Sequence, residues 1–339
     1  MARDIVGKGD SDKDWKIVPT EHANQFAAQA PSLAENLRSS RIEGLAKMYE
    51  GLNRKAVDAR NRFKSAIARA DLAIFCAASF GALLLAGGAL SEILDKVSDR
   101  IIPVIGVLVL LSSGWATMLL SQVKGQKLAT NWEGTRAKAE AKRLAYFKAV
   151  MEGASKEPFD QLLALEYARR FLLDNQIDYF QERGAQHENA AQSSIKTSTQ
   201  AVFIASSLTA LAGLASIVEP KMSALAGLGV IASAYAALAV SRSALSLDRR
   251  NADRYLIAGE QLMERRLELD SFRARVAAGD YPAVQEFFEP IFVILESDHK
   301  AFLSDSEQRE LAIGRMQARL DAIKTGQSAT VESSTETGE

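Results

Sequence analysis

The chain has 339 residues, with 41 Lys and Arg against 42 Asp and Glu and a formal net charge of −1. This balance argues against a nucleic-acid partner, because nucleic-acid-binding surfaces are strongly basic. A single cysteine, Cys76, excludes an intramolecular disulfide. The first residues of the chain contain no apolar stretch, so we expect no cleavable secretion signal.

The N-terminal part of the chain, 1–39, is polar, and we expect it to be a flexible segment. A helix is predicted to begin at Ser40, since Ser40 and Glu43 have the spacing of a capping box. This helix leads straight into an apolar block, 72–90. A second apolar block, 101–121, follows after a short polar link.

Helix-forming sequence continues after the second block. We predict helices from about Thr130 and from Pro158, where proline suits the first helical turn. A polar helix then runs into a third apolar block, 201–218, and three residues separate it from a fourth, 222–241. The remaining predicted elements are a charged helix over 248–278, a helix restarting near Pro282, a terminal helix over 304–324 and a disordered tail over 325–339.

Each apolar block holds 18 to 21 residues without Asp, Glu, Lys or Arg. A helix needs about 20 apolar residues to cross roughly 30 Å of hydrocarbon, and a helix satisfies its own backbone hydrogen bonds in lipid. One such block could be a buried core helix, but four blocks in two close pairs indicate a membrane. The predicted fold is an all-α membrane protein with four transmembrane helices, arranged as two hairpins with long cytoplasmic helices.

The short links within the two pairs fix the predicted topology. They hold only three basic residues, Lys96, Arg100 and Lys221, whereas the longer segments are rich in Lys and Arg close to the spans. Positive charge marks the cytoplasmic side of a membrane protein. We therefore expect a multi-pass membrane protein with both termini cytoplasmic.

The order of elements repeats once along the chain. A polar helix, a two-span hairpin and a second charged helix occupy 40–178, and the same order occupies 179–303. Both copies enter the membrane from the same side, so the repeat is parallel. That arrangement argues against the inverted-repeat transporter designs.

A short motif follows the first hairpin: Asn131-Trp132, then Arg136, then Ala139-Glu140. A polar helix, a two-span hairpin and this motif together resemble the SLATT family of bacterial two-transmembrane effector proteins, here in two copies over about 42–178 and 179–303. The second copy departs from the motif. No tryptophan follows its spans, and Arg254 and Glu260 are six residues apart where Arg136 and Glu140 are four apart.

The resemblance implies a class of activity. Members of this family are expected to permeabilise the inner membrane during defence against phage, once a sensor or nucleotide-signalling partner protein detects infection. The expected partners are therefore the lipid bilayer, further copies of this chain and such a sensor.

We predict that the chain is not an enzyme and uses no cofactor or metal. Its histidines, His22, His187 and His299, lie in separate segments without metal-ligand spacing. The sequence contains no P-loop, GxSxG or HExxH motif.

Trp132, Arg136 and Glu140 are four residues apart and share one helix face. They are a candidate docking face for a neighbouring helix or a partner. The alternative, which we favour, is an interfacial tryptophan beside an ordinary i,i+4 ion pair.

Small residues recur every four positions in three of the spans, and this spacing lets helices approach closely in lipid. Helix packing is the default interpretation, and the alternative is that hydroxyl groups line a narrow path between assembled copies. The candidate packing or pore-lining residues are Ser113, Thr117 and Ser121 in the second span, Ala205, Thr209 and Gly213 in the third, and Gly229, Ser233, Ala237 and Ser241 in the fourth.

These features favour a membrane effector that oligomerises and permeabilises the inner membrane on activation. A second hypothesis is a non-conducting membrane scaffold that recruits partners through its cytoplasmic helices. A small-molecule transporter is disfavoured, because the spans contain no break and no charged residue that suggest a substrate site.

Overall fold

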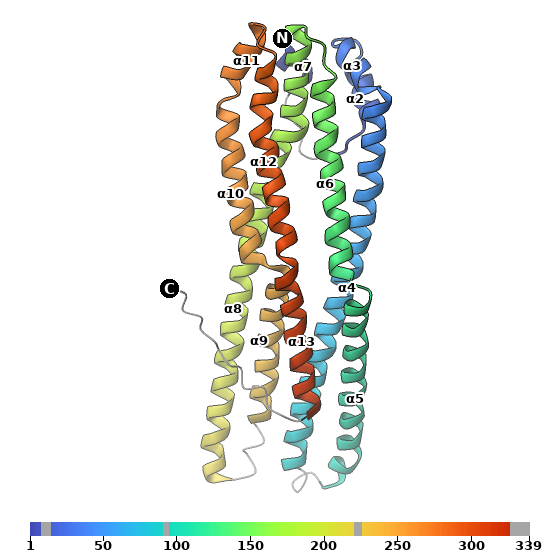
Figure 1. Ribbon diagram of the computed structural model, residues 1–339. Helices are drawn as coiled ribbons and strands as arrows, with labels where there is room; N and C mark the ends of the chain where they lie inside the picture. Colours follow the sequence, from blue (N-terminus) through green and yellow to red (C-terminus); the bar gives the residue numbers. More distant parts are fainter. Residues whose placement is uncertain (8–14, 91–94, 220–225, 326–339) are drawn as a thin grey trace. The chain divides into compact units, whose positions relative to one another are not determined.

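The computed structural model is all-α over the residues that it describes, namely 1–7, 15–90, 95–219 and 226–325 (Figure 1). No strand occurs within these ranges. The elements are α1 (Ala2–Val6), α2 (Pro19–Phe26), α3 (Pro31–Leu37), α4 (Ser40–Leu90), α5 (Asp95–Gly125), α6 (Leu128–Glu152), α7 (Pro158–Ala168), the π-helical segment η1 (Arg169–Asp174), α8 (Asn175–Val218), α9 (Ala226–Ser246), α10 (Asp248–Leu267), α11 (Leu269–Ala277), α12 (Pro282–Ser304) and α13 (Ser306–Thr325).

Four helices are long and apolar enough to cross a membrane, which confirms the predicted all-α membrane protein. The first three apolar blocks lie within α4, α5 and α8. The fourth lies in α9 from Ala226 onward, while 222–225 fall outside the described residues. The helix that begins at Ser40 runs without interruption into its span, as the capping-box spacing and the unbroken helix-forming sequence predict.

The chain divides into two compact units. The head unit comprises 1–61, 129–189 and 248–306, and the span unit comprises 62–128, 190–247 and 307–339. Each unit contains parts of both predicted repeats. The predicted repeat therefore describes the order of elements along the chain. The compact units instead divide the long helices into a polar part, in the head unit, and an apolar part, in the span unit.

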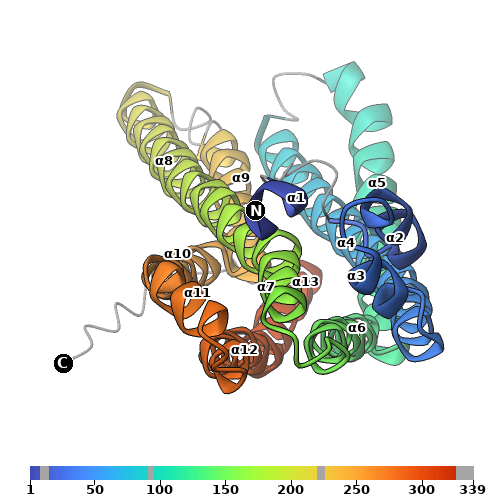
Figure 2. The same cartoon turned by 90° about the horizontal axis from the view of Figure 1, so that it is seen from above.

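The head unit is built around a core of large aromatic and aliphatic side chains. Tyr146, Tyr167, Phe287 and Phe288 are fully buried in it. In this unit α10 and α11 follow one another along the chain, and both pack against α12 (Figure 2). Burial of this much apolar surface stabilises the unit in the way usual for a water-soluble domain.

Residues 1–39 differ from the flexible segment that their polarity predicts. They contain α1, α2 and α3, which bury Val6, Phe26, Leu33 and Leu37 in the core of the head unit. Proline occupies the first turn of both α2 and α3, where its fixed φ angle favours a helix. The apolar residues are few, but they are spaced so that short helices place them on one face. Residues 8–14, and the predicted tail from 326 onward, lie outside the described residues.

The predicted boundary between the two repeats, at 178/179, is not a break in the structure. Pro158 begins α7 as predicted, and helical structure then continues through η1 and α8 to Val218. The predicted helix over 248–278 is instead divided at Glu268 into α10 and α11.

The repeat has a counterpart in the backbone. Among the residues that the structure describes, two without glycine's freedom adopt a left-handed conformation, Lys127 with φ 48° and Leu247 with φ 52°. Lys127 lies between α5 and α6, and Leu247 lies between α9 and α10, so both follow the second span of a hairpin. This conformation is unfavourable for residues with a Cβ atom, and it occurs directly after each hairpin, at positions 120 residues apart.

Candidate functional site

The fourth span packs against two other spans through glycines. A Cβ atom on Gly229 would lie 2.7 Å from Thr209 Oγ1 and 3.0 Å from the carbonyl oxygen of Ala205, so α9 meets the backbone of α8 there. A Cβ atom on Gly227 would lie 3.0 Å from Ala86 Cβ and 3.1 Å from the Ala82 carbonyl oxygen in α4. α9 accordingly lies between α8 and α4 (Figure 1). Such close approach is typical of helix packing in lipid.

The structure brings together only some of the predicted small residues. Ala205 and Thr209 meet Gly229, whereas Gly213 faces open space. Two hydroxyls bond to their own helices, Thr209 to the Ala205 carbonyl at 2.9 Å and Thr117 to the Ser113 carbonyl at 2.8 Å. By burial, Ser113, Ala205, Gly229 and Ser241 are buried, Thr117 and Ala237 are half-buried, and Ser121, Thr209, Gly213 and Ser233 are exposed.

A layer of hydroxyl groups, which we call the hydroxyl layer, occurs at one depth in the spans. Ser79 is seven residues from the start of the first apolar block, and Thr209 is eight from the start of the third. Ser113 and Ser233 are each eight residues from the end of the second and fourth blocks. At 1.5 Å per residue, all four lie about 10–12 Å from the same end of the spans.

Two members of this layer have unused hydrogen-bonding capacity. The Oγ atoms of Ser79 and Ser113 are buried and have no hydrogen-bond partner among the described residues. Sequence reasoning missed Ser79, because it does not belong to a four-residue repeat of small residues. Counting depth from the span ends would have found it.

A second polar site lies at the start of the first span and the end of the fourth span. Asp71 precedes the first apolar block, and its side chain is 1% exposed. Arg242 follows the fourth block, and its Nε atom lies 3.4 Å from Asp71 Oδ2. Arg319 of α13 donates a hydrogen bond from Nη1 to the Ala237 carbonyl oxygen at 3.2 Å.

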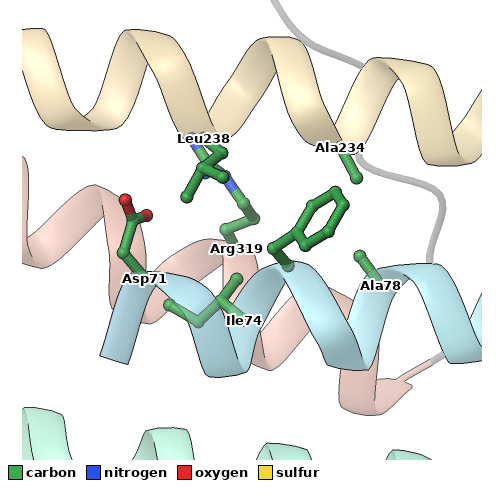
Figure 3. Close-up of a pocket in the computed structure, with 7 residues that line it drawn as sticks. Asp71, Ile74, Ala78, Ala234, Leu238 and Arg319 are labelled. Carbon is green, nitrogen blue, oxygen red and sulfur yellow. The ribbon is translucent and has the colours of Figure 1, made fainter. Parts of the chain in front are cut away.

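Figure 3 shows Arg319 reaching from α13 toward α4 and α9. A small pocket there is lined by Asp71, Ile74, Phe75, Ala78, Ala234, Leu238 and Arg319. Three helices therefore contribute to one site in the span unit. Sequence reasoning did not place α13 at the spans, because its composition is that of a surface helix.

The predicted docking face of α6 lies in the head unit and contacts two helices of the same chain. The Trp132 ring packs edge-on against Phe302 of α12, with centroids 5.5 Å apart. Arg136 donates a hydrogen bond from Nη1 to Asn53 Oδ1 of α4 at 3.1 Å. Arg136 also pairs with Glu140 at 2.5 Å. This geometry ties α6 to α4 and α12.

The arginine at the corresponding place in the second copy has different partners. Arg254 of α10 pairs through Nε with Asp298 at 2.8 Å and through Nη1 with Asp305 at 3.1 Å. Its guanidinium also lies 5.7 Å from the centroid of the Phe302 ring. Because both partners lie outside α10, the six-residue separation from Glu260 does not prevent ion pairing. Phe302 thus contacts the motif residue Trp132 of one copy and the motif arginine of the other.

Burial and ion pairing act differently on the acids of this network. Burial raises the pKa of Asp298 to about 6, although Arg254 opposes the change. Burial also acts to raise the pKa of Glu140, but Arg136 and Arg143 outweigh it and hold that pKa below its usual value. Burial lowers the pKa of His299. The pKa of Asp298 therefore lies closer to neutral pH than the pKa of Glu140.

No group of three or more His, Cys, Asp or Glu residues that could hold a metal ion occurs in the described part of the chain. Comparison with family models, with curated proteins and with solved structures finds no match to this chain.

Proposed function

We propose that this protein is a membrane effector that oligomerises and permeabilises the bacterial inner membrane when it is activated. The observation that carries the proposal is the exposure of Ser233, a member of the hydroxyl layer, on the outside of a single chain. Lipid offers a hydroxyl group no hydrogen-bond partner, so a second copy of the chain can supply one to Ser233. Assembly would bring the hydroxyl layers of several copies to one depth in the membrane.

The fourth span packs closely on two neighbouring spans within one chain. Gly227 and Gly229 bring α9 into close contact with α4 and α8, which leaves no room for water along those two contacts. The spans contain no Asp, Glu, Lys or Arg, the residues that give pumps and selective channels their ion sites. We therefore propose a non-selective lesion between copies.

The membrane orientation and the biological setting are parts of the same proposal. The excess of Lys and Arg in the longer segments supports cytoplasmic termini and a cytoplasmic head unit. The resemblance to the SLATT effectors supports a role in defence against phage, under the control of a sensor or nucleotide-signalling partner. The head unit offers that partner a folded surface.

The test is the inner-membrane potential, followed with a voltage-sensitive dye in bacteria that express the chain alone and with its genomic neighbours. We expect depolarisation by the wild-type chain, and its loss when Ser233 is replaced by leucine. Val230→Leu is the matched control, since Val230 is an exposed apolar residue on the same helix. Cross-linking in membranes reports whether each variant still assembles. An unchanged potential in every combination, with the protein present in the membrane, would contradict the proposal.

The alternative is a non-conducting scaffold that recruits partners through its helices. The extensive core of the head unit, which includes the N-terminal helices, favours it, because a rigid folded domain suits stable recruitment. A scaffold predicts a steady potential and equal partner recruitment by the wild-type chain and the Ser233→Leu variant. Co-purification of partners with both proteins would distinguish the two functions.

A further inference from the structure

The last described helix, α13, has an unusual position for its composition. Seven of its 20 residues are charged, yet it belongs to the span unit and not to the head unit. Polar helices of this kind ordinarily lie in water. Its place beside the spans therefore requires specific contacts.

The contacts of α13 reach both hairpins. Its buried residues are Ala312, Ile313, Met316 and Leu320, together with Arg309 near its start, so the buried face is mostly apolar. Arg319 lies at the edge of this face and lines the pocket with residues of α4, which belongs to the first hairpin, and of α9, which belongs to the second (Figure 3). A helix seated in this way holds the two hairpins together.

Arg319 reaches inside the limits of the apolar blocks. Its hydrogen-bond acceptor, the Ala237 carbonyl, is four residues from the end of the fourth block, or about 6 Å. Ala78 and Ala234, which line the same pocket, are next in sequence to Ser79 and Ser233 of the hydroxyl layer. The seat of α13 thus adjoins the layer that we propose lines the lesion.

The seat is also incompletely satisfied. The Oδ2 atom of Asp71 is buried and has no hydrogen-bond partner among the described residues, and its ion pair with Arg242 measures 3.4 Å. A charge-assisted hydrogen bond is typically shorter, at about 2.7–2.9 Å. Arg319 of α13 attracts this carboxylate across the pocket, so the docked helix is held by a single long-range charge contact and one hydrogen bond, and such a contact is suited to release.

The start of α13 is tied to the charged network of the head unit. A single residue, Asp305, separates α12 from α13, and its side chain pairs with Arg254 at 3.1 Å and with Arg250 at 3.5 Å. Any change in the pairing of Arg254 therefore acts on the residue from which α13 begins.

We propose that α13 is an autoinhibitory helix. Docked between α4 and α9, it keeps the hairpins of one chain together and the hydroxyl layer closed. Its release, governed at Asp305, frees the hairpins to assemble with other copies. The inference rests on the proposed function and adds the element that regulates it.

The test uses the full-length protein, with Cys76→Ala, in vesicles of phosphatidylethanolamine and phosphatidylglycerol that contain a fluorescent dye. In this background Arg319→Cys removes the hydrogen bond to Ala237, and Ala237→Cys provides a partner thiol for a short cleavable cross-linker. We expect the doubly substituted protein to release dye about tenfold faster than the parent, as loss of a charged hydrogen bond would allow. Cross-linking should abolish the release, and cleavage of the linker should restore it.

Two further variants complete the design. Asp305→Asn should accelerate dye release like Arg319→Ala, because both loosen the docked helix. Arg315→Ala is the matched control, since Arg315 is exposed on the same helix, and it should behave as the parent. Circular dichroism verifies that each variant is folded.

The outcomes separate the inference from the proposed function. Equal dye release with and without the cross-link would overturn the autoinhibitory role and leave the membrane-permeabilising function standing. Absence of dye release from every variant, together with a steady potential in cells, would overturn both. Release that is blocked and restored by the linker would support both.

Discussion

The head unit and the span unit differ in the side chains that make their internal contacts. Buried phenylalanine and tyrosine side chains fill the head unit, whereas glycine and alanine make the close contacts of the span unit. In the span unit large apolar side chains point outward, as Phe203 and Leu214 do. Burial of apolar surface away from water lowers the free energy of the folded chain. Lipid is as apolar as leucine, so moving apolar surface out of lipid brings no such stabilisation. The same chain therefore uses large residues for one core and small residues for the other.

The largest expected effect comes from deleting the same side chain in each unit. Phe288→Ala should lower the free energy of unfolding by about 3–5 kcal/mol, because Phe288 is fully buried in the head unit. Phe203→Ala should cost less than about 1 kcal/mol, because lipid replaces the lost contacts. Thermal unfolding in detergent micelles, followed by circular dichroism, measures both. Equal losses would remove the distinction between the two kinds of packing.

A smaller effect is expected where a methyl group is added to the span unit. Gly229→Ala should destabilise the α8–α9 contact by about 1–3 kcal/mol, because the new Cβ would lie 2.7 Å from Thr209 Oγ1. Gly213→Ala is the matched control, since the space around Gly213 is open. The same thermal measurement applies. If the two variants were equally stable, close glycine packing would not hold these spans.

The head unit should show a pH dependence that originates at Asp298. Its pKa in the folded chain is about 6, while in the unfolded chain it titrates near 4. Between these values the folded form holds a proton that the unfolded form has released, so this contribution to stability falls as pH rises and is lost above about pH 6. Asp298→Asn removes the contribution.

The variant should therefore gain about 1–2 kcal/mol relative to the wild type between pH 5 and pH 7. The comparison is needed because burial lowers the pKa of the neighbouring His299, which adds a slope of opposite sign in both proteins. Arg136, Glu140 and Arg254 also act on Asp298, and all three remain in the variant. Parallel stability–pH curves for the two proteins would exclude Asp298 as the source.

The smallest effect is expected at the surface of the head unit. Arg41 and Glu152 form an ion pair at 2.8 Å, but both side chains are more than half exposed. Arg41→Ala should change the free energy of unfolding by less than about 0.5 kcal/mol, because water and salt screen such pairs. A loss comparable to that of Phe288→Ala would mean that surface charges, and not the aromatic core, stabilise this unit.

The spans could be predicted from sequence because the membrane imposes a simple demand, an unbroken apolar run of sufficient length. The continuation of α4 into its span followed from the absence of a helix breaker. Other features depended on tertiary contacts that composition conceals. The N-terminal helices have few apolar residues, and their folding depends on burying those residues in the core of the head unit.

The candidate sites were predictable to different degrees. The four-residue spacing identified Ala205, Thr209 and Gly229, which meet in the structure. It did not distinguish them from Gly213, because a spacing specifies a helix face and not its neighbour. The role of Arg319 could not be predicted from sequence, because a basic residue in a charged helix gives no sign that its partners lie in the spans.

The contact of Gly227 with Ala82 and Ala86 joins the second hairpin of the chain to the first. Because one polypeptide carries both hairpins, their encounter is intramolecular and does not depend on the concentration of the protein. Dilution in the bilayer can separate one chain from another but not these two hairpins. Low expression therefore leaves each molecule as a preassembled pair, and any ring formed from whole chains contains an even number of hairpins.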